Sequence, residues 1–424
     1  MHIIEKIGGT SMSDYASVRD NIIFSKDKKN FYQRACVVSA YSGVTDKLLE
    51  HKKSGQPGVF GLFASSIEDD SWSAMFDQLS TELNQINHQL FGDGELLLRA
   101  NRFLNERLES AKQCLLDLQS LCQHGHFVLE AHLDTVREML ASIGEAHSAW
   151  NMTQLLQRDG VNACFVDLTG WRSTAHISLD ERIRTAFANI DLDRQLPVVT
   201  GYAHSNIGLM SSFDRGYSEM TFSRLAVLTK ASEAIIHKEF HLSSADPRIV
   251  GEDKAIPIGR TNYDVADQLA NLGVEAIHPK AAKGLRQNNI PLRVKNTFEP
   301  EHTGTLITGD YVSDSPRVEI IAGCKGIYAL ELFDQDMAGS IHNYDREVLS
   351  IIARFKAHIV SKDINANTLT HFLSTNLKTV NRIQAAVEER YPEAELNQQK
   401  VAIVSAIGSD MQIPGILAKT VQAV

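Results

Sequence analysis

The sequence is poor in cysteine, and no two cysteines have the C-x-x-C spacing that structural zinc sites use. Five are scattered over the 424 residues: Cys36, Cys114, Cys122, Cys164 and Cys324. Because their number is odd and their spacing irregular, the sequence predicts no disulfide framework. Small buried thiols in a reducing compartment are the simpler interpretation.

Long hydrophobic runs are missing as well. No stretch approaches the ~18 apolar residues of a membrane-spanning helix, and the N-terminus has no charged-then-apolar signal pattern. We therefore expect a soluble protein of the cytoplasm that has no membrane partner.

A surplus of positive charge is also absent. The chain has 42 Lys and Arg against 52 Asp and Glu, a net charge of −10. Nucleic acid is not expected as a main partner, because affinity for a phosphate backbone needs clustered cations. The balance is compatible with a small anionic ligand held by a few cations and backbone N–H groups. The G-x-x-x-x-G-K-[ST] loop of P-loop enzymes does not occur.

What the sequence does contain is an alternation of short apolar runs and longer helical patterns. Its length predicts two or three domains, and 43% hydrophobic residues are enough for sizeable cores. Runs typical of buried strands span residues 3–7, 35–39, 165–168, 198–200, 234–236 and 292–294. The alternation predicts an α/β fold with a mostly parallel open sheet between helical layers. Residues 72–157 are helical in pattern, with an apolar stripe typical of packing at Leu104, Leu108, Ala111, Leu115 and Leu118.

The composition changes at residues 308–316, a polar stretch typical of a linker. Beyond it, the pattern predicts a strand at 328–333, a helix at 340–356, strands at 358–364 and 368–373, and a second helix with Leu377, Val380, Ile383 and Val387 on its apolar face. This β-α-β-β-α order is typical of a ferredoxin-like unit. A strand at 401–405 and a helix after Pro414 predict the start of a second, incomplete unit, so we expect either a longer natural chain or pairing of this end with another subunit. The expected domains are residues 1–310, 317–396 and 397–424.

Candidate phosphate-binding residues lie at the end of the first predicted strand and directly after it. Lys6, Gly8, Gly9 and Thr10 combine a cation, two adjacent glycines and a hydroxyl. Glycines let the backbone approach a ligand, and their N–H groups can bind phosphate oxygens. A lysine at a strand end can place positive charge on a transferring phosphoryl group. An ordinary turn is the alternative.

The second predicted strand ends in another candidate loop, which runs from Ser39 through Thr45 to Asp46. Ligands of open parallel sheets bind beyond the carboxyl ends of the strands, so both loops lie at the binding edge. A helix N-cap is the alternative for this loop, and the two functions are compatible.

A glycine interrupts the helical pattern of residues 142–148, beside Glu145. Glycine within a helix costs roughly 1 kcal/mol relative to alanine, which calls for a reason such as close approach of a ligand. Glu145 would then pair with an ammonium group. An exposed helical glutamate is the alternative.

Two further segments carry paired charges. Arg215 precedes a glycine and a helix start, which suits bidentate capture of a carboxylate, and Ser218 could cap that helix or bind substrate. Asp246, Arg248 and Lys254 form a mixed-charge turn that could close over a nucleotide. An ordinary solvated turn explains that segment equally well.

Taken together, the glycine-rich lysine loop and the motifs SAYSGVTD, SIGEAHS, DRGYSE, ADPRIV, AIHPKA and VKNTF resemble the aspartokinase family in order and approximate spacing. The resemblance spans essentially the whole chain, and the later unit resembles an ACT domain. The segments DRGYSEMTFSR and HKEFHLSSADPR are similar to those of aspartokinases associated with ectoine biosynthesis.

This resemblance implies an amino-acid-kinase fold followed by a ferredoxin-like ACT region. It also implies transfer of the γ-phosphoryl group of ATP to the β-carboxylate of L-aspartate, the first step of the aspartate pathway. Lys6 would neutralise the phosphoryl group in flight, and Glu219 would organise that lysine. Matching positions for aspartate are Thr45, Glu145, Arg215 and Ser218; those for ATP are Gly8, Gly9, Thr10, Ser39, Asp246, Arg248 and Lys254. Mg²⁺ would bind through the ATP phosphates, without ligands from the protein, and the ACT region would form a homodimer or larger homo-oligomer.

The chain departs from the family pattern at two places. Glu219 stands where the family usually has aspartate, and Ile236, His237, Lys238 and Ser243 stand where it has nucleotide-binding Trp, Thr, Asp and Tyr. Adenine contacts must therefore differ. Two alternatives stay open: a catalytically weakened homologue that senses an amino acid, and a kinase for another small amino acid, since Glu145 and Arg215 fit any α-amino acid.

Overall fold

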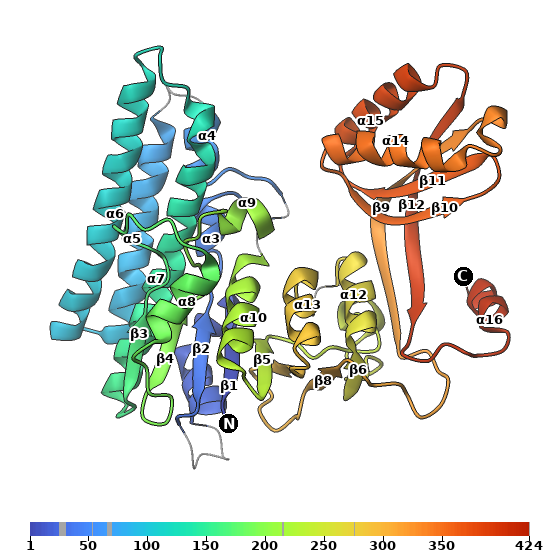
Figure 1. Cartoon of the computed structure of the whole chain (residues 1–424). Helices are drawn as coiled ribbons and strands as arrows, with labels where there is room; N and C mark the ends of the chain where they lie inside the picture. Colours follow the sequence, from blue (N-terminus) through green and yellow to red (C-terminus); the bar gives the residue numbers. More distant parts are fainter. Residues whose placement is uncertain (25–30, 53, 66–69, 214–215, 275, 424) are drawn as a thin grey trace. The chain divides into compact units, whose positions relative to one another are not determined.

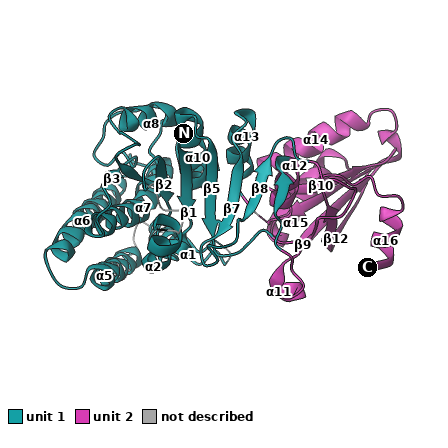
Figure 2. Cartoon of the chain, turned by 90° about the horizontal axis from the view of Figure 1, so that it is seen from below, with its two compact units in different colours: residues 1–242, 257–263, 277–311 teal, residues 243–256, 264–276, 312–424 magenta. Residues whose placement is uncertain are grey.

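The computed structural model describes residues 1–24, 31–52, 54–65, 70–213, 216–274 and 276–423. These residues form two compact units, coloured separately in Figure 2. Unit 1 comprises residues 1–242, 257–263 and 277–311, and unit 2 comprises residues 243–256, 264–276 and 312–424. The main division at residues 311 and 312 falls within the polar stretch that the sequence marks as a linker.

Unit 1 is built on an eight-stranded sheet with the order β3-β4-β2-β1-β5-β7-β8-β6. The strands are β1 (Ile3–Ile7), β2 (Arg34–Val38), β3 (Ala163–Val166), β4 (Leu196–Thr200), β5 (Glu233–Lys238), β6 (Arg260–Asn262), β7 (Leu292–Asn296) and β8 (Thr305–Thr308). All neighbours pair in parallel except β7 and β8. The mostly parallel α/β sheet and its six predicted strands are confirmed, whereas the short strands β6 and β8 were not expected.

The central strands are buried on both faces, which explains why they appear in the sequence as continuous apolar runs. The helices of unit 1 are α1 (Gly9–Met12), α2 (Tyr15–Ser17), α3 (Val44–Leu48), α4 (Val59–Ser65), α5 (Ser71–Phe91), α6 (Glu95–Cys122), α7 (Leu133–Arg158), α8 (Leu179–Phe187), α9 (Leu209–Phe213), α10 (Tyr217–Thr229) and α13 (Pro279–Gln287). A π-helical turn, η1 (Val18–Ile23), follows α2, and a 3-10 turn, η2 (Leu129–Ala131), precedes α7.

The long helical pattern in the sequence corresponds to α5, α6 and α7, which lie side by side in Figure 1. On α6, Leu104, Leu108, Ala111 and Leu115 are buried and Leu118 is half-buried, so the apolar stripe is packing surface as expected.

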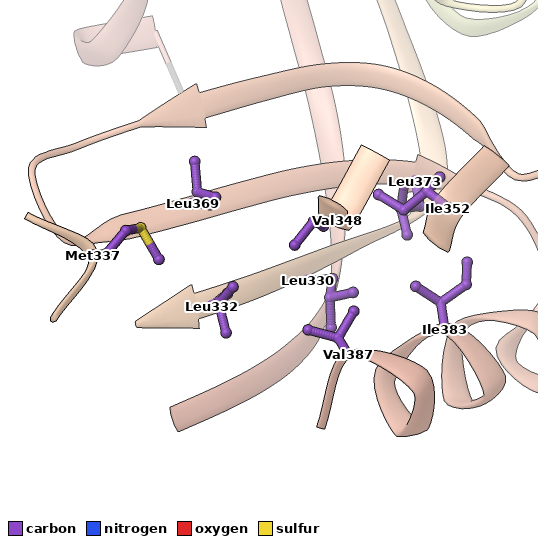
Figure 3. Close-up of a cluster of buried hydrophobic side chains, with 9 residues drawn as sticks. All are labelled: Leu330, Leu332, Met337, Val348, Ile352, Leu369, Leu373, Ile383 and Val387. Carbon is purple, nitrogen blue, oxygen red and sulfur yellow. The ribbon is translucent and has the colours of Figure 1, made fainter. Parts of the chain in front are cut away.

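Unit 2 contains a four-stranded antiparallel sheet with the order β10-β11-β9-β12. The elements are α11 (Pro247–Val250), α12 (Tyr263–Asn271, whose first residue belongs to unit 1), β9 (Ile320–Phe333), η4 (Gln335–Met337), α14 (Ile341–Arg354), β10 (His358–Ile364), β11 (Thr368–Ser374), α15 (Leu377–Arg390), β12 (Glu395–Ile407) and α16 (Ile416–Ala423). Figure 3 shows the core between the sheet and its two long helices, formed by Leu330, Leu332, Met337, Val348, Ile352, Leu369, Leu373, Ile383 and Val387. This sheet fits the predicted ACT region.

The boundary expected between residues 396 and 397 falls inside β12. That strand pairs with β9 along its whole length, so residues 401–405 continue the fourth strand of the first sheet rather than opening a separate one. Gly326, at φ +77°, is an extra residue opposite the step between Val401 and Ala402, and this bulge divides the ribbon into two parts. The expected helix after Pro414 is α16.

Within the described ranges, no helix is both long and apolar enough to cross a membrane.

Candidate active site

The carboxyl end of β1 carries Lys6, whose ammonium faces a carboxylate on α10. Lys6 is 8% exposed, and its Nζ lies 4.0 Å from Oε1 of Glu219. The backbone N–H of His278, which caps α13, donates to Oε2 of Glu219 at 2.5 Å. Burial acts to raise the pKa of Glu219, but Lys238, Lys6 and this N–H group outweigh it and hold the pKa below its usual value. The site therefore pairs a buried lysine with an ionised carboxylate.

The loop after β1 contains the predicted phosphate-binding glycines. The N–H of Gly8 donates to the carbonyl of His237 at 3.2 Å, which ties the loop to the end of β5. A Cβ on Gly9 would lie 2.8 Å from the carbonyl oxygen of Ala40, so only glycine permits the approach of the neighbouring loop. Thr10, in α1, is exposed.

The loop after β2 is held by α7. The hydroxyl of Ser148 donates to the carbonyl of Ser39 at 2.8 Å, and the N–H of Ser39 donates to the carbonyl of Ile7 at 3.1 Å. Thr45, half-buried, lies in α3, which starts after Gly43 in the left-handed conformation (φ +78°). Both predicted loops thus lie side by side at the carboxyl edge of the sheet.

Glu145 is buried on α7 and only 2% exposed, so the alternative of an exposed helical glutamate is wrong. Its Oε2 has no hydrogen-bond partner among the described residues. Burial raises the pKa of this carboxyl to about 8, against opposing effects of Lys6, the Tyr217 hydroxyl and the backbone of Tyr202 and Ala40. A buried carboxylate oxygen without a donor is suited to a ligand that brings its own positive charge.

Ser218 of α10 and Glu145 of α7 both lie close to Gly201, the residue that follows β4. A Cβ on Gly201 would lie 2.6 Å from the Ser218 Cβ and 3.0 Å from Oε2 of Glu145, so only glycine lets the end of β4 approach both side chains this closely. Ser218 is itself buried, with 6% of its surface exposed.

The glycine within α7 has a different explanation from the one expected. A Cβ on Gly144 would lie 2.8 Å from the Ala40 Cβ and 3.1 Å from Cγ1 of Val44. The helix therefore needs glycine to pack against the loop after β2, rather than to admit a ligand.

The other predicted residues are not among the described residues of unit 1. Arg215 lies outside the described residues. Asp246, Arg248 and Lys254 belong to unit 2, where Asp246 caps α11 and accepts two hydrogen bonds from the Arg248 guanidinium at 2.8 and 3.0 Å. Lys254 is exposed in the same turn. The structure thus brings together residues from β1, the two loops, α7 and α10.

Several residues of this cluster were not predicted. Tyr217, beside Ser218, faces Glu145, and Lys238 ends β5 beside Glu219. Glu138 accepts hydrogen bonds from the Tyr202 hydroxyl (2.6 Å) and the Met210 N–H (2.7 Å), which fixes α9 ahead of α10. The strand pattern could have predicted the position of Lys238. It comes two residues after Ile236, the partner of Lys6, and side chains two residues apart in a strand lie on the same face.

Comparison with known proteins agrees with the fold. The model of the "Amino acid kinase family" matches residues 1–296. The chain is 53% identical over 424 residues to "Aspartate kinase Ask_Ect" of Stutzerimonas stutzeri (strain A1501), covering 100% of this chain and 89% of that protein. It is 25% identical over 406 residues to the aspartokinase of Candida albicans, covering 91% of this chain and 70% of that protein.

Among solved structures, E. coli aspartokinase III in complex with aspartate and ADP matches with a TM-score of 0.74 and 19% identity, covering 100% of this chain and 91% of that one. Clostridium acetobutylicum aspartate kinase matches with a TM-score of 0.67 and 18% identity, over 99% and 90% of the two chains. These likenesses support the fold, and the sequence matches supply the family. The chain belongs to the amino acid kinase family and, within it, to the aspartokinases.

Proposed function

We propose that this protein transfers the γ-phosphoryl group of ATP to the β-carboxylate of L-aspartate, which yields 4-phospho-L-aspartate and ADP. The observation that carries this proposal is at the sheet edge, where Lys6 faces both Glu219 and Glu145, whose buried Oε2 has no hydrogen-bond partner among the described residues. Full-length identity of 53% to a protein named aspartate kinase supports the same reaction.

In this proposal the amino acid binds through complementary charge. Its α-ammonium group pairs with Glu145, whose Oε2 is buried without a donor among the described residues. Ser218 and Thr45 donate hydrogen bonds, and Arg215 binds the α-carboxylate, a role that its resemblance to the family motif supports. The β-carboxylate is then directed toward Lys6.

The reaction needs no general base, because a β-carboxylate with a pKa of about 3.9 is already ionised at neutral pH. One of its oxygens forms a bond to the γ-phosphorus while the bond from that phosphorus to the β,γ-bridging oxygen breaks, and ADP leaves with the electron pair. Lys6 stabilises the negative charge of the phosphoryl group, and Glu219 keeps the lysine in place. Gly8, Gly9, Thr10 and Ser39 line the approach of the phosphates.

Mg²⁺ enters this scheme with ATP. In this scheme the ion is held by the phosphate oxygens and by water, since Mg²⁺ usually keeps several waters and binds through substrate phosphates. The bound ion would neutralise charge on the phosphate oxygens.

The remaining proposals concern unit 2. Asp246, Arg248 and Lys254 are proposed to contact the nucleotide, and the antiparallel sheet with α14 and α15 is proposed as an ACT domain through which the chain forms a homo-oligomer. The resemblance to Ask_Ect favours a role in supplying the aspartate pathway for ectoine. ATP and free thiols are both typical of the cytoplasm, where we expect the enzyme to act.

The test is an assay of purified protein with ATP, Mg²⁺, aspartate and hydroxylamine. We expect a hydroxamate to form with aspartate and not with glutamate, asparagine or serine, and K6M to abolish it. A folded wild-type protein that binds aspartate but forms no hydroxamate would overturn the proposal in favour of an amino-acid sensor. If another amino acid is the preferred substrate, that amino acid rather than aspartate is the phosphoryl acceptor.

A further inference from the structure

The end of β5 carries a lysine that the proposed mechanism does not use. In the parallel pairing of β1 and β5, Lys6 is opposite Ile236, and paired residues of neighbouring strands point to the same face of the sheet. Lys238 comes two residues after Ile236, so its side chain leaves the sheet on the face of Lys6, one step further toward the carboxyl edge.

His237, the residue between Ile236 and Lys238, is consistent with this alternation. His237 points to the opposite face, where its Nε2 lies 3.0 Å from Oε1 of the buried Glu5. Glu5 also pairs with Arg34 at 3.1 Å on that side. The two faces of the sheet therefore carry separate charged groups, and Lys238 belongs to the group around Lys6.

A carboxylate connects the two lysines. Oε1 of Glu219 lies 4.0 Å from Nζ of Lys6, and Lys238 is the strongest of the charges that lower the pKa of Glu219. One carboxylate thus faces two ammonium groups. Glu145, which also faces Lys6, is mostly neutral at pH 7 because burial raises its pKa to about 8.

The backbone of Lys238 is fixed on both sides. The carbonyl of the preceding His237 accepts the N–H of Gly8 at 3.2 Å, and the carbonyl of Lys238 accepts the N–H of Thr297 at 2.8 Å. The half-buried side chain therefore starts from a rigid position directly beside the loop of Gly8 and Gly9. A cation in this position can stabilise the negative charge of a ligand that binds to that loop.

We propose that Lys238 is a second catalytic lysine, which contacts the phosphates of the donor nucleotide on the same side as Lys6. This inference rests on the proposed kinase function. Lys6 and Lys238 share Glu219 as their common counter-ion, and together they offset the charge that a triphosphate brings and that the departing diphosphate retains.

The chain offers a matched control in Lys295. It is the last residue but one of β7 and pairs with His237 in the register, so it lies on the opposite face from Lys238. K238M and K295M each remove one half-buried ammonium group from adjacent strand ends, but only the first is on the face of Lys6.

The experiment measures binding of ADP and adenosine by calorimetry, and turnover in the hydroxamate assay, for wild type, K238M, K238R and K295M. We expect K238M to weaken ADP binding about ten- to hundredfold, the size of a lost charged hydrogen bond, while adenosine binding changes less than about threefold. The kcat of K238M should fall at least tenfold with the KM for aspartate within about threefold. K238R should recover most of the ADP affinity, and K295M should match wild type.

Unchanged ADP affinity in K238M would overturn the inference. So would equal losses for ADP and adenosine, or equal losses in K238M and K295M, because these outcomes mean a structural role. If K238M does not fold, the same comparison is made with K238Q. The proposed function can fail separately. If wild type forms no aspartyl hydroxamate but K238M still weakens ADP binding, aspartate is not the phosphoryl acceptor, and the role of Lys238 in nucleotide binding stands.

Discussion

The protonation of Glu145 makes a prediction that distinguishes a ligand-binding carboxylate from a structural one. The pKa of this carboxyl is raised from 4.5 to about 8 because burial disfavours the charged form. Between these two values, the folded protein holds a proton that the unfolded chain releases. Rising pH therefore lowers the free energy of unfolding across this window, and the effect is complete above pH 8.

The magnitude follows from the size of the shift. At 1.36 kcal/mol for each pKa unit, the window of 4.5 to 8 corresponds to roughly 5 kcal/mol, of which roughly 2 kcal/mol falls between pH 6 and pH 8. E145Q cannot titrate and resembles the protonated carboxyl in shape. Its stability relative to wild type should therefore increase by roughly 2 kcal/mol between pH 6 and pH 8, and change little above pH 8.5.

Denaturant unfolding at a series of pH values measures this difference. D134N, which removes an exposed acid from the same helix, is the control and should show no such trend. A difference between E145Q and wild type that is constant from pH 6 to pH 8 would refute the reasoning about burial.

Aspartate binding should show the reverse linkage. An ammonium group beside Glu145 stabilises the ionised form, so binding near pH 7 should release close to one proton from wild type and none from E145Q. Calorimetry in buffers with different ionisation enthalpies measures this release. Full aspartate affinity in E145Q would show that Glu145 does not hold the ammonium group.

Three further substitutions test the packing that supports the site. G144A should destabilise unit 1 by about 1–3 kcal/mol and raise the KM for aspartate, since its Cβ would lie 2.8 Å from that of Ala40; steady-state kinetics and thermal unfolding measure both effects. E5Q leaves the buried Arg34 without its carboxylate and should cost about 3 kcal/mol, seen as a lower urea midpoint; wild-type stability would show that the pair does not matter. L369A removes a fully buried side chain and should destabilise the core of unit 2 by about 2–5 kcal/mol; hydrogen exchange in β9 and β11 measures it, and unchanged protection would contradict the packing.

The strands of unit 1 could be predicted because the interior of a parallel sheet demands continuous apolar runs. β1 is found at residues 3–7 as expected, and the other five differ by a few residues at their ends. β6 and β8 were missed because three or four residues give no readable alternation. In β12 only residues 401–405 were expected as a strand, because the preceding residues 395–400 are mostly polar and give no apolar run.

The burial of Glu145 could not be predicted from periodicity. Between Leu140 and Ala149 every residue of α7 is buried, polar ones included, so the helix has no exposed face in this segment. Local pattern assigns a glutamate there to the surface. The loop after β2, the end of β4 and Tyr217 of α10 pack against this segment and bury Glu145, and these contacts join residues far apart in the sequence.

The central claim is that a carboxylate oxygen of aspartate attacks the γ-phosphorus of ATP. The most direct measurement uses aspartate labelled with ¹⁸O in its β-carboxylate, with hydroxylamine as the trap and mass spectrometry of the phosphate released. Hydroxylamine attacks the carbonyl carbon of the acyl phosphate, so each hydroxamate formed should release one phosphate that carries one ¹⁸O atom. Phosphate without ¹⁸O would mean that water, not aspartate, accepts the phosphoryl group, and would contradict the account.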